Sequence, residues 1–318
     1  MKKFGVILAF VSLCSLSFAQ TYESTGTENS NDTTKTGVMD PIRAPIDGVY
    51  KKIHLSQFRP IELQSIREAD VLYTRLTWSV IDLREKMNHP LYFPTEPRGN
   101  WKSLMQTIID VTTDSTEANP NPIYVYQDEY LTLPLTREGL KESMGNSRTE
   151  PILNDWGEQV GEQVIFIPYG SREVFKYIIK DQYIVDKQRS VMEPRTIGIC
   201  PMFWFESLNA DTYQEENYDD DMPAVTPRRW REFGWLYYNE LRPVFAVTEV
   251  FNPKNNAQRR TYDDIFLMRH FSSYIRGAEN EYNNRQVSEY IVNGMDQRLE
   301  SDRMKNLIRE QEHDMWEY

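Results

Sequence analysis

The sequence predicts an α+β fold, in which helices at both ends of one domain flank a central, mostly antiparallel β region. Two observations lead to this prediction. Apolar residues recur at steps of three and four within residues 67–94 and 261–278, which is the spacing of an amphipathic helix. Between residues 157 and 251, runs of β-branched and aromatic residues are separated by Gly, Pro and Asn, which is typical of short strands joined by turns.

One domain is expected over residues 63–318, and its first element is a helix within residues 67–94. The apolar face of this helix consists of Leu72, Leu76, Val80, Leu83 and Met87. Asn88-His89-Pro90 ends the helix, because a proline disfavours helical geometry in the residue before it.

Three short elements are expected next. Residues 101–111 predict a second helix, since their apolar side chains again share one face. Residues 123–126 predict a strand. Residues 137–144 predict a short helix, which the hydroxyl of Thr136 caps.

The central region is expected to be mostly strands. Three apolar runs predict strands at residues 163–167, 174–179 and 196–200. Residues 181–193 fit either a strand or a helix. Residues 234–238 and 244–250 predict two further strands, paired as a hairpin.

Two helices are expected at the C-terminal end. Thr261 and Asp264 resemble a capping box at the start of a helix over residues 261–278, which Gly277 ends. A charged helix then runs from about residue 287 to the end of the chain. Its narrow stripe consists of the apolar residues Leu299, Met304, Leu307, Ile308 and Met315, together with Gln311.

The residues before the domain are expected to divide into three segments. Residues 1–19 fit a cleaved signal peptide, with lysines before an apolar run and a small residue, Ala19, at the cleavage site. The polar residues 20–40 predict a disordered tail. In residues 41–62, prolines interleaved with apolar residues predict an extended arm. This arm either packs on its own domain or lies on a neighbouring subunit.

Charge and cysteine content narrow the class of protein. The formal net charge is −12, so nucleic acid and anionic lipid are not expected as partners. No stretch after the signal peptide is long and apolar enough to predict a membrane span. Since Cys14 leaves with the signal peptide, Cys200 remains alone and no intrachain disulfide is expected. Its apolar surroundings predict a buried, inert thiol.

The sequence contains no familiar metal, phosphate or nucleophile motif. Three weaker candidates have structural alternatives. His270 beside Asp263 and Asp264 suggests an acid–base pair or a structural contact. The acidic residues 211–223 suggest a calcium loop or a solvated loop, and the basic residues 228–231 suggest an anion site or a surface cluster. We therefore assign no catalytic, cofactor or metal residue.

Four blocks of the sequence resemble one known family. They are READVLYTRLTWSVIDLREKMNHPLYFP at residues 67–94, RTIGICPM at 195–202, DDIFLMRHFSSYIR at 263–276, and residues 299–318, which begin with LESDR and end with EHDMWEY. From about residue 60 to the end, the chain resembles the GldN/PorN family of the Bacteroidetes type IX secretion system.

The resemblance implies a periplasmic protein without enzymatic activity or cofactor. It implies a ring at the inner face of the outer membrane, built with a GldK/PorK-like lipoprotein and with further copies of the chain. It also implies contact with a GldM/PorM-like motor protein. The alternative is a periplasmic hydrolase or metal-dependent enzyme with an unrecognised site. The candidate partner contacts are Ile42, Ile46, Tyr50, Trp230, Trp235 and Tyr237.

Overall fold

A computed structural model of the chain describes Val49 and residues 58–99, 101–112, 122–153, 159–206, 228–252, 254–255 and 257–315. The chain divides into two compact units, Met1–Lys52 and Ile53–Tyr318, and the fold given below is that of the second unit. The predicted signal peptide and polar tail lie outside the described residues, as does the acidic segment 211–223.

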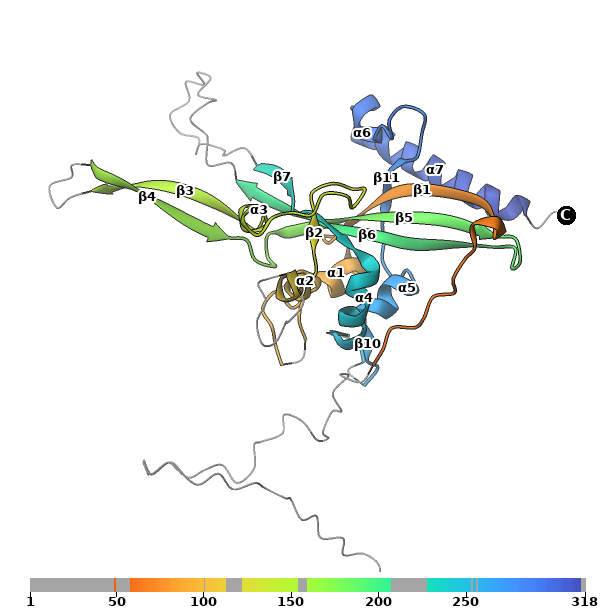
Figure 1. Cartoon of the computed structure of the whole chain (residues 1–318), viewed down its shortest axis with the longest axis horizontal. Coiled ribbons are helices and arrows are strands. Elements are labelled where there is room, and N and C mark those ends of the chain that lie inside the picture. Colours follow the sequence, from red (N-terminus) through yellow and green to blue (C-terminus); the bar gives the residue numbers. More distant parts are fainter. Residues whose placement is uncertain are drawn as a thin grey trace, which may run out of the picture. The chain divides into compact units, whose positions relative to one another are not determined.

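The second unit has an α+β fold, as predicted, with a mostly antiparallel sheet (Figure 1). Within the described residues, the main sheet has the strand order β11-β1-β5-β6-β8-β2, and β7 also pairs with β6. Its strands are β1 (Val71–Asp82), β2 (Val125–Tyr126), β5 (Val174–Asp186), β6 (Val191–Glu206), β7 (Arg228–Glu232), β8 (Trp235–Tyr237) and β11 (Tyr274–Ala278).

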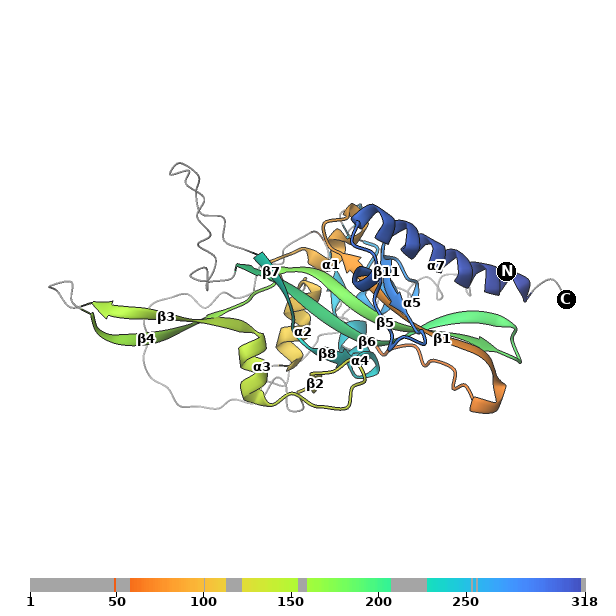
Figure 2. The same cartoon turned by 90° about the horizontal axis from the view of Figure 1, so that it is seen from above.

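Two small sheets accompany the main one. β9 (Glu249–Val250) pairs with β10 (Arg260–Thr261), and β3 (Gly145–Leu153) pairs with β4 (Gln159–Pro168). The β3–β4 hairpin extends away from the main sheet just before the chain enters β5 (Figures 1 and 2). β4, β5 and β6 confirm the three strands that were predicted at residues 163–167, 174–179 and 196–200. The ambiguous residues 181–193 belong to β5, β6 and the turn between them.

The helices are mostly short. They are α1 (His89–Tyr92), α2 (Leu104–Thr112), α3 (Arg137–Ser143), α4 (Tyr238–Val247), α5 (Tyr262–Leu267), α6 (Val287–Tyr290) and α7 (Gly294–Asp314), with 3-10 turns at Glu68–Asp70 and Lys86–Asn88. α2 and α3 lie where they were predicted. The hydroxyl of Thr136 caps α3 by accepting a hydrogen bond from the backbone N–H of Gly139 at 3.2 Å, as expected.

Residues 71–82 form a strand, so the prediction of a helix within residues 67–94 is wrong. β1 lies between β5 and β11 in the sheet, and residues 77–81 are all buried. A strand covered on both faces loses the alternation of apolar and polar residues that identifies half-buried strands. Its apolar residues then fit helical spacing equally well.

The predicted helix over residues 261–278 is correct only in its first part. Thr261 and Asp264 form the expected capping box of α5. The helix ends early, because Arg269 has φ +50° and so lies in the left-handed region. The chain then forms β11, where Gly277 lies opposite Trp78 of β1 instead of ending a helix.

The predicted hairpin of residues 234–250 is also wrong, because its second strand is replaced by a helix. β8 leads directly into α4, which contains Pro243, and only Glu249–Val250 is extended. The buried side chains of α4 include Tyr238, Leu241 and Phe245, which are spaced by three and four residues. Burial of this helical face outweighs the effect of the internal proline.

The placement of helices at both ends of the domain is supported in part. The C-terminal end consists of α6 and α7, whereas the N-terminal end begins with a 3-10 turn and β1. On α7, Met304 and Ile308 are buried as expected. Leu299 is 62% exposed, so the buried face is rotated away from part of the predicted stripe.

The core forms on both faces of the sheet. One face carries Ile81, Tyr177 and Ile179, which pack with residues of α2, α4 and α5 in the main cluster. The alternate residues Trp78, Val80 and Ile178 belong to a second cluster, with Cys200 and Trp235. A third cluster joins α7 to β11 and to the far ends of β5 and β6. The burial of Cys200 is therefore confirmed.

Candidate functional site

Trp230, one of the candidate contacts, lies on the outer strand β7 and is partly exposed. Its ring centroid is 4.3 Å from that of Trp204, which is its cross-strand partner on β6. The ammonium group of Lys176 lies 4.4 Å from the centroid of the Trp230 ring. Burial lowers the pKa of Lys176. Trp230 thus combines internal contacts with a surface that remains open to solvent.

Trp235 has a different environment, because it is only 4% exposed. Its ring packs closely over Gly198, where an added Cβ would lie 3.4 Å from the ring. Trp235 contributes to the core of this chain, so its side chain presents almost no area to a partner.

Of the four remaining candidate contacts, the structure describes Tyr237. Tyr237 is partly exposed, and its hydroxyl accepts a hydrogen bond from Asn239 Nδ2 at 2.8 Å. Ile42, Ile46 and Tyr50 lie outside the described residues. Of the two candidate tryptophans, therefore, Trp230 offers accessible surface and Trp235 does not.

The domain end of the arm is attached to a buried ion pair. Arg242 Nε and Nη2 donate to the two carboxylate oxygens of Asp263 at 3.0 and 3.2 Å, and Nη2 also donates to the carbonyl of Ile61 at 2.5 Å. Tyr238 donates its hydroxyl proton to Asp263 at 3.2 Å. The side chains of Arg242 and Asp263 are 7% and 4% exposed. This cluster fixes the path by which the arm enters the domain.

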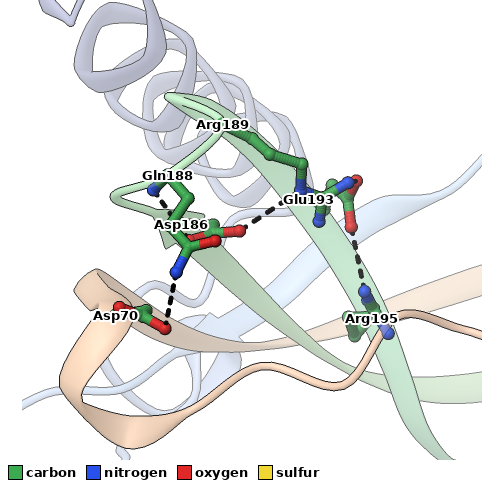
Figure 3. A network of polar contacts seen from close by, with 6 residues as sticks. All are labelled: Asp70, Asp186, Gln188, Arg189, Glu193 and Arg195. Carbon is green, nitrogen blue, oxygen red and sulfur yellow. Dashed lines mark hydrogen bonds and ion pairs between the residues drawn. The ribbon is translucent and has the colours of Figure 1, made fainter.

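The turn between β5 and β6 is held by a network of polar contacts (Figure 3). Gln188 bridges to the start of β1 by donating its side-chain N–H to Asp70 at 3.1 Å. Arg189 pairs with both Asp186 and Glu193, and Glu193 also pairs with Arg195. The hydrogen bond from the backbone of Gln188 and the nearby Arg189 lower the pKa of Asp186. These contacts join the turn to both of its strands and to the residue that precedes β1.

The β3–β4 hairpin carries apolar surface that the domain does not cover. On β4, Ile165, Phe166 and Ile167 are 37%, 46% and 46% exposed. Successive strand residues point to opposite faces, so apolar side chains are exposed on both faces of the hairpin. At its base, Arg231 Nη1 donates to the carbonyl of Gly145 at 3.3 Å. Consecutive exposed apolar residues on a strand are typical of a surface that binds another chain.

The side chains considered as catalytic candidates are either paired with other groups or exposed to solvent. His270 is exposed, while Asp263 pairs with Arg242 and Asp264 caps α5. Burial raises the pKa of the Cys200 thiol, which leaves it protonated and unreactive. Within the described ranges, no three His, Cys, Asp or Glu side chains gather as metal ligands. None of the helices in those ranges has the length and hydropathy needed to cross a bilayer.

Comparison with known families identifies the chain. The family described as "Gliding motility associated protein GldN" matches residues 66–317. The chain belongs to the GldN family. This family match spans every strand and helix described above, so β1 and α7 are both elements of the GldN fold. A comparison with curated proteins finds no match.

Two features of the GldN domain were not predicted from the sequence: the exposed apolar surface of β4, and the hydrogen bond from Arg242 to Ile61. The exposure of β4 had no signal in the sequence, since the run Val164–Ile167 is apolar without alternation, a pattern typical of a strand covered on both faces. The link from Arg242 to Ile61 had none, because its partners lie 181 residues apart in the chain.

Proposed function

We propose that this chain is a non-enzymatic structural subunit of the type IX protein secretion machinery, and of the gliding apparatus where one is present. It acts in the periplasm, at the inner face of the outer membrane. There it forms a ring with a GldK/PorK-like lipoprotein and further copies of itself, and it contacts a GldM/PorM-like motor protein. Membership of the gliding-motility family GldN carries the proposal.

The exposed apolar strand β4 supports a role in assembly. A ring subunit needs two unlike surfaces, because each copy binds the next one head to tail. Ile165, Phe166 and Ile167 provide one apolar surface of this kind, separate from the main core. Trp230 and Tyr237 on the main sheet provide further partly exposed aromatic surface.

Co-purification with the lipoprotein tests the proposal. Size-exclusion chromatography with light scattering should show a large complex of the two proteins. The double substitution Ile165→Gln and Ile167→Gln should reduce the mass of this complex and leave the unfolding transition of the isolated chain nearly unchanged, because these side chains are already partly solvated.

A matched control uses Val292→Gln with Met295→Gln. These side chains are 97% and 69% exposed and lie near the start of α7, so the same chemical change falls on another surface. This variant should assemble as the native chain does. A native chain that stays monomeric in the presence of the lipoprotein would contradict the proposed function.

A further inference from the structure

We propose that residues 41–57 of the arm of one copy add a β-strand to the edge of β4 in a second copy. This inference rests on the proposed function and names the contact between neighbouring copies. The added strand is a segment of this chain that precedes residue 58, where the described part of the domain begins.

The receiving surface is the β3–β4 hairpin. It is a separate two-stranded sheet, so within the described ranges each of its strands has one unpaired edge. A hairpin of two strands is only marginally stable by itself, and an open edge with apolar side chains readily pairs with another strand. Ile165 and Ile167 on one face and Phe166 on the other would flank an added strand and gain cover from it.

The arm has a sequence suited to this edge. From Val49 to Leu55, apolar and basic residues suit an extended strand, in which Ile53 and Leu55, two residues apart, would face the same side. Residues 41–57 contain three basic residues and one acidic residue, whereas residues 145–168 contain four acidic residues and one basic residue. The arm is therefore a positive segment in a chain with a net charge of −12, and the hairpin carries the opposite sign.

The segment 41–57 is longer than the strand that it would join. Arg242 holds the chain at Ile61, so the arm begins from a fixed point on the domain. Residues 41–57 in an extended conformation span about 56 Å, while the strand β4 is about 33 Å long, at roughly 3.3 Å per residue. The segment can thus leave its own domain and still pair with much of β4.

The contact is head to tail. The arm enters its domain beside α4, whereas the hairpin extends away from the main sheet, so the two partners belong to different surfaces of one copy (Figure 1). Repetition of such a contact joins copies in one direction and closes into a ring when the rotation between copies allows it.

Cross-linking between separately prepared chains tests the inference. One chain carries Val49→Cys and the other Ile165→Cys, both expressed from Gln20 onward, so that buried Cys200 is the remaining native thiol. Mild oxidation of the mixture should give a disulfide-linked heterodimer on a non-reducing gel. A control pair, Val49→Cys with Val292→Cys, should give only background, although residue 292 is 97% exposed.

Charge substitutions test whether attraction between the basic arm and the acidic hairpin contributes to the contact. Lys51→Glu with Lys52→Glu on the arm should lower the heterodimer yield several-fold. Glu150→Lys with Glu162→Lys on the hairpin chain should restore it, because the signs are again opposite.

Two results would overturn the inference. One is a heterodimer yield no higher than that of the control pair. The other is a disulfide formed only within single chains that carry both cysteines, which would place the arm on its own hairpin. Binding to the lipoprotein, measured by co-elution, separates this test from that of the proposed function: a chain that binds the lipoprotein without the arm cross-link retains the function and loses the inference.

Discussion

At the scale of single residues, burial decides what an ion pair contributes. Arg242 and Asp263 are almost fully buried, and Asp263 also accepts a hydrogen bond from Tyr238. Arg84 pairs with Asp82 at 2.6 Å, but the Arg84 side chain is 65% exposed. Removing one member of a buried pair leaves an uncompensated charge, whereas water replaces the partner of an exposed one.

The substitution Arg242→Met should therefore be far more destabilising than Arg84→Met. We expect Arg242→Met to lower the free energy of unfolding by about 3–5 kcal/mol. For Arg84→Met we expect a loss of about 0–1 kcal/mol, since solvent screens the exposed pair. Urea unfolding followed by tryptophan fluorescence measures both. Equal losses for the two variants would show that the Arg242 pair is not effectively buried.

Residue-level predictions succeeded where the partner is close in sequence. Thr136 and Thr261 cap helices by bonding to backbone groups three residues ahead, so the sequence alone indicates both contacts. Asn88 is different. It is fully buried and bonds to the backbone of Ser272, 184 residues away, in both directions. Such a link depends on the fold and leaves no local pattern.

At the scale of elements, α7 shows how packing selects one face of a helix. Apolar residues lie on more than one side of this helix, and the predicted stripe included Leu299 together with Ile308. In the fold, Ile308 packs with Met304, Ile275 and Val287, while Leu299 is exposed. The position of β11 thus decides which apolar residues of α7 enter the core.

Alanine substitutions on α7 should separate these two faces. Ile308→Ala should lower the free energy of unfolding by about 2–4 kcal/mol, because it leaves a cavity against β11. Leu299→Ala should change it by no more than about 0.5 kcal/mol. Thermal and urea unfolding provide the measurement. A large loss from Leu299→Ala in the isolated chain would mean that the helix packs through the other face.

At the scale of the whole molecule, buried tyrosines couple stability to alkaline pH. Tyr177, Tyr238 and Tyr262 are buried, and burial raises the pKa of each phenol above its ordinary value of 10.0. The unfolded chain loses these protons near pH 10, while the folded chain retains them to higher pH. Their contribution to stability is therefore complete below pH 10 and is lost as the pH rises through the folded-state values.

We expect the free energy of unfolding to fall steeply above pH 10. Tyr262→Phe should cost about 1 kcal/mol at pH 7, because it removes the 2.7 Å hydrogen bond from the hydroxyl to the carbonyl of Lys102. Above pH 10 its slope should be shallower than that of the native chain, since one titrating phenol is gone. Urea unfolding at a series of pH values between 7 and 11 checks both expectations. If stability falls with pH equally steeply in the native chain and in Tyr262→Phe, Tyr262 does not contribute to the loss of stability above pH 10.

The sequence by itself determined the fold class, the family, the helix caps and the burial of Cys200, because these depend on composition, local spacing and contiguous blocks. Only the tertiary structure decided that residues 71–82 and 274–278 are strands and that residues 238–247 are a helix. The reason is that residues 77–81 of β1 are buried on both faces and so show no clear period, while Pro243 argues against the helix that α4 forms. In both cases the neighbours with which the segment packs select its conformation. The same holds for β4, whose exposed apolar residues only the fold distinguishes from those of the core.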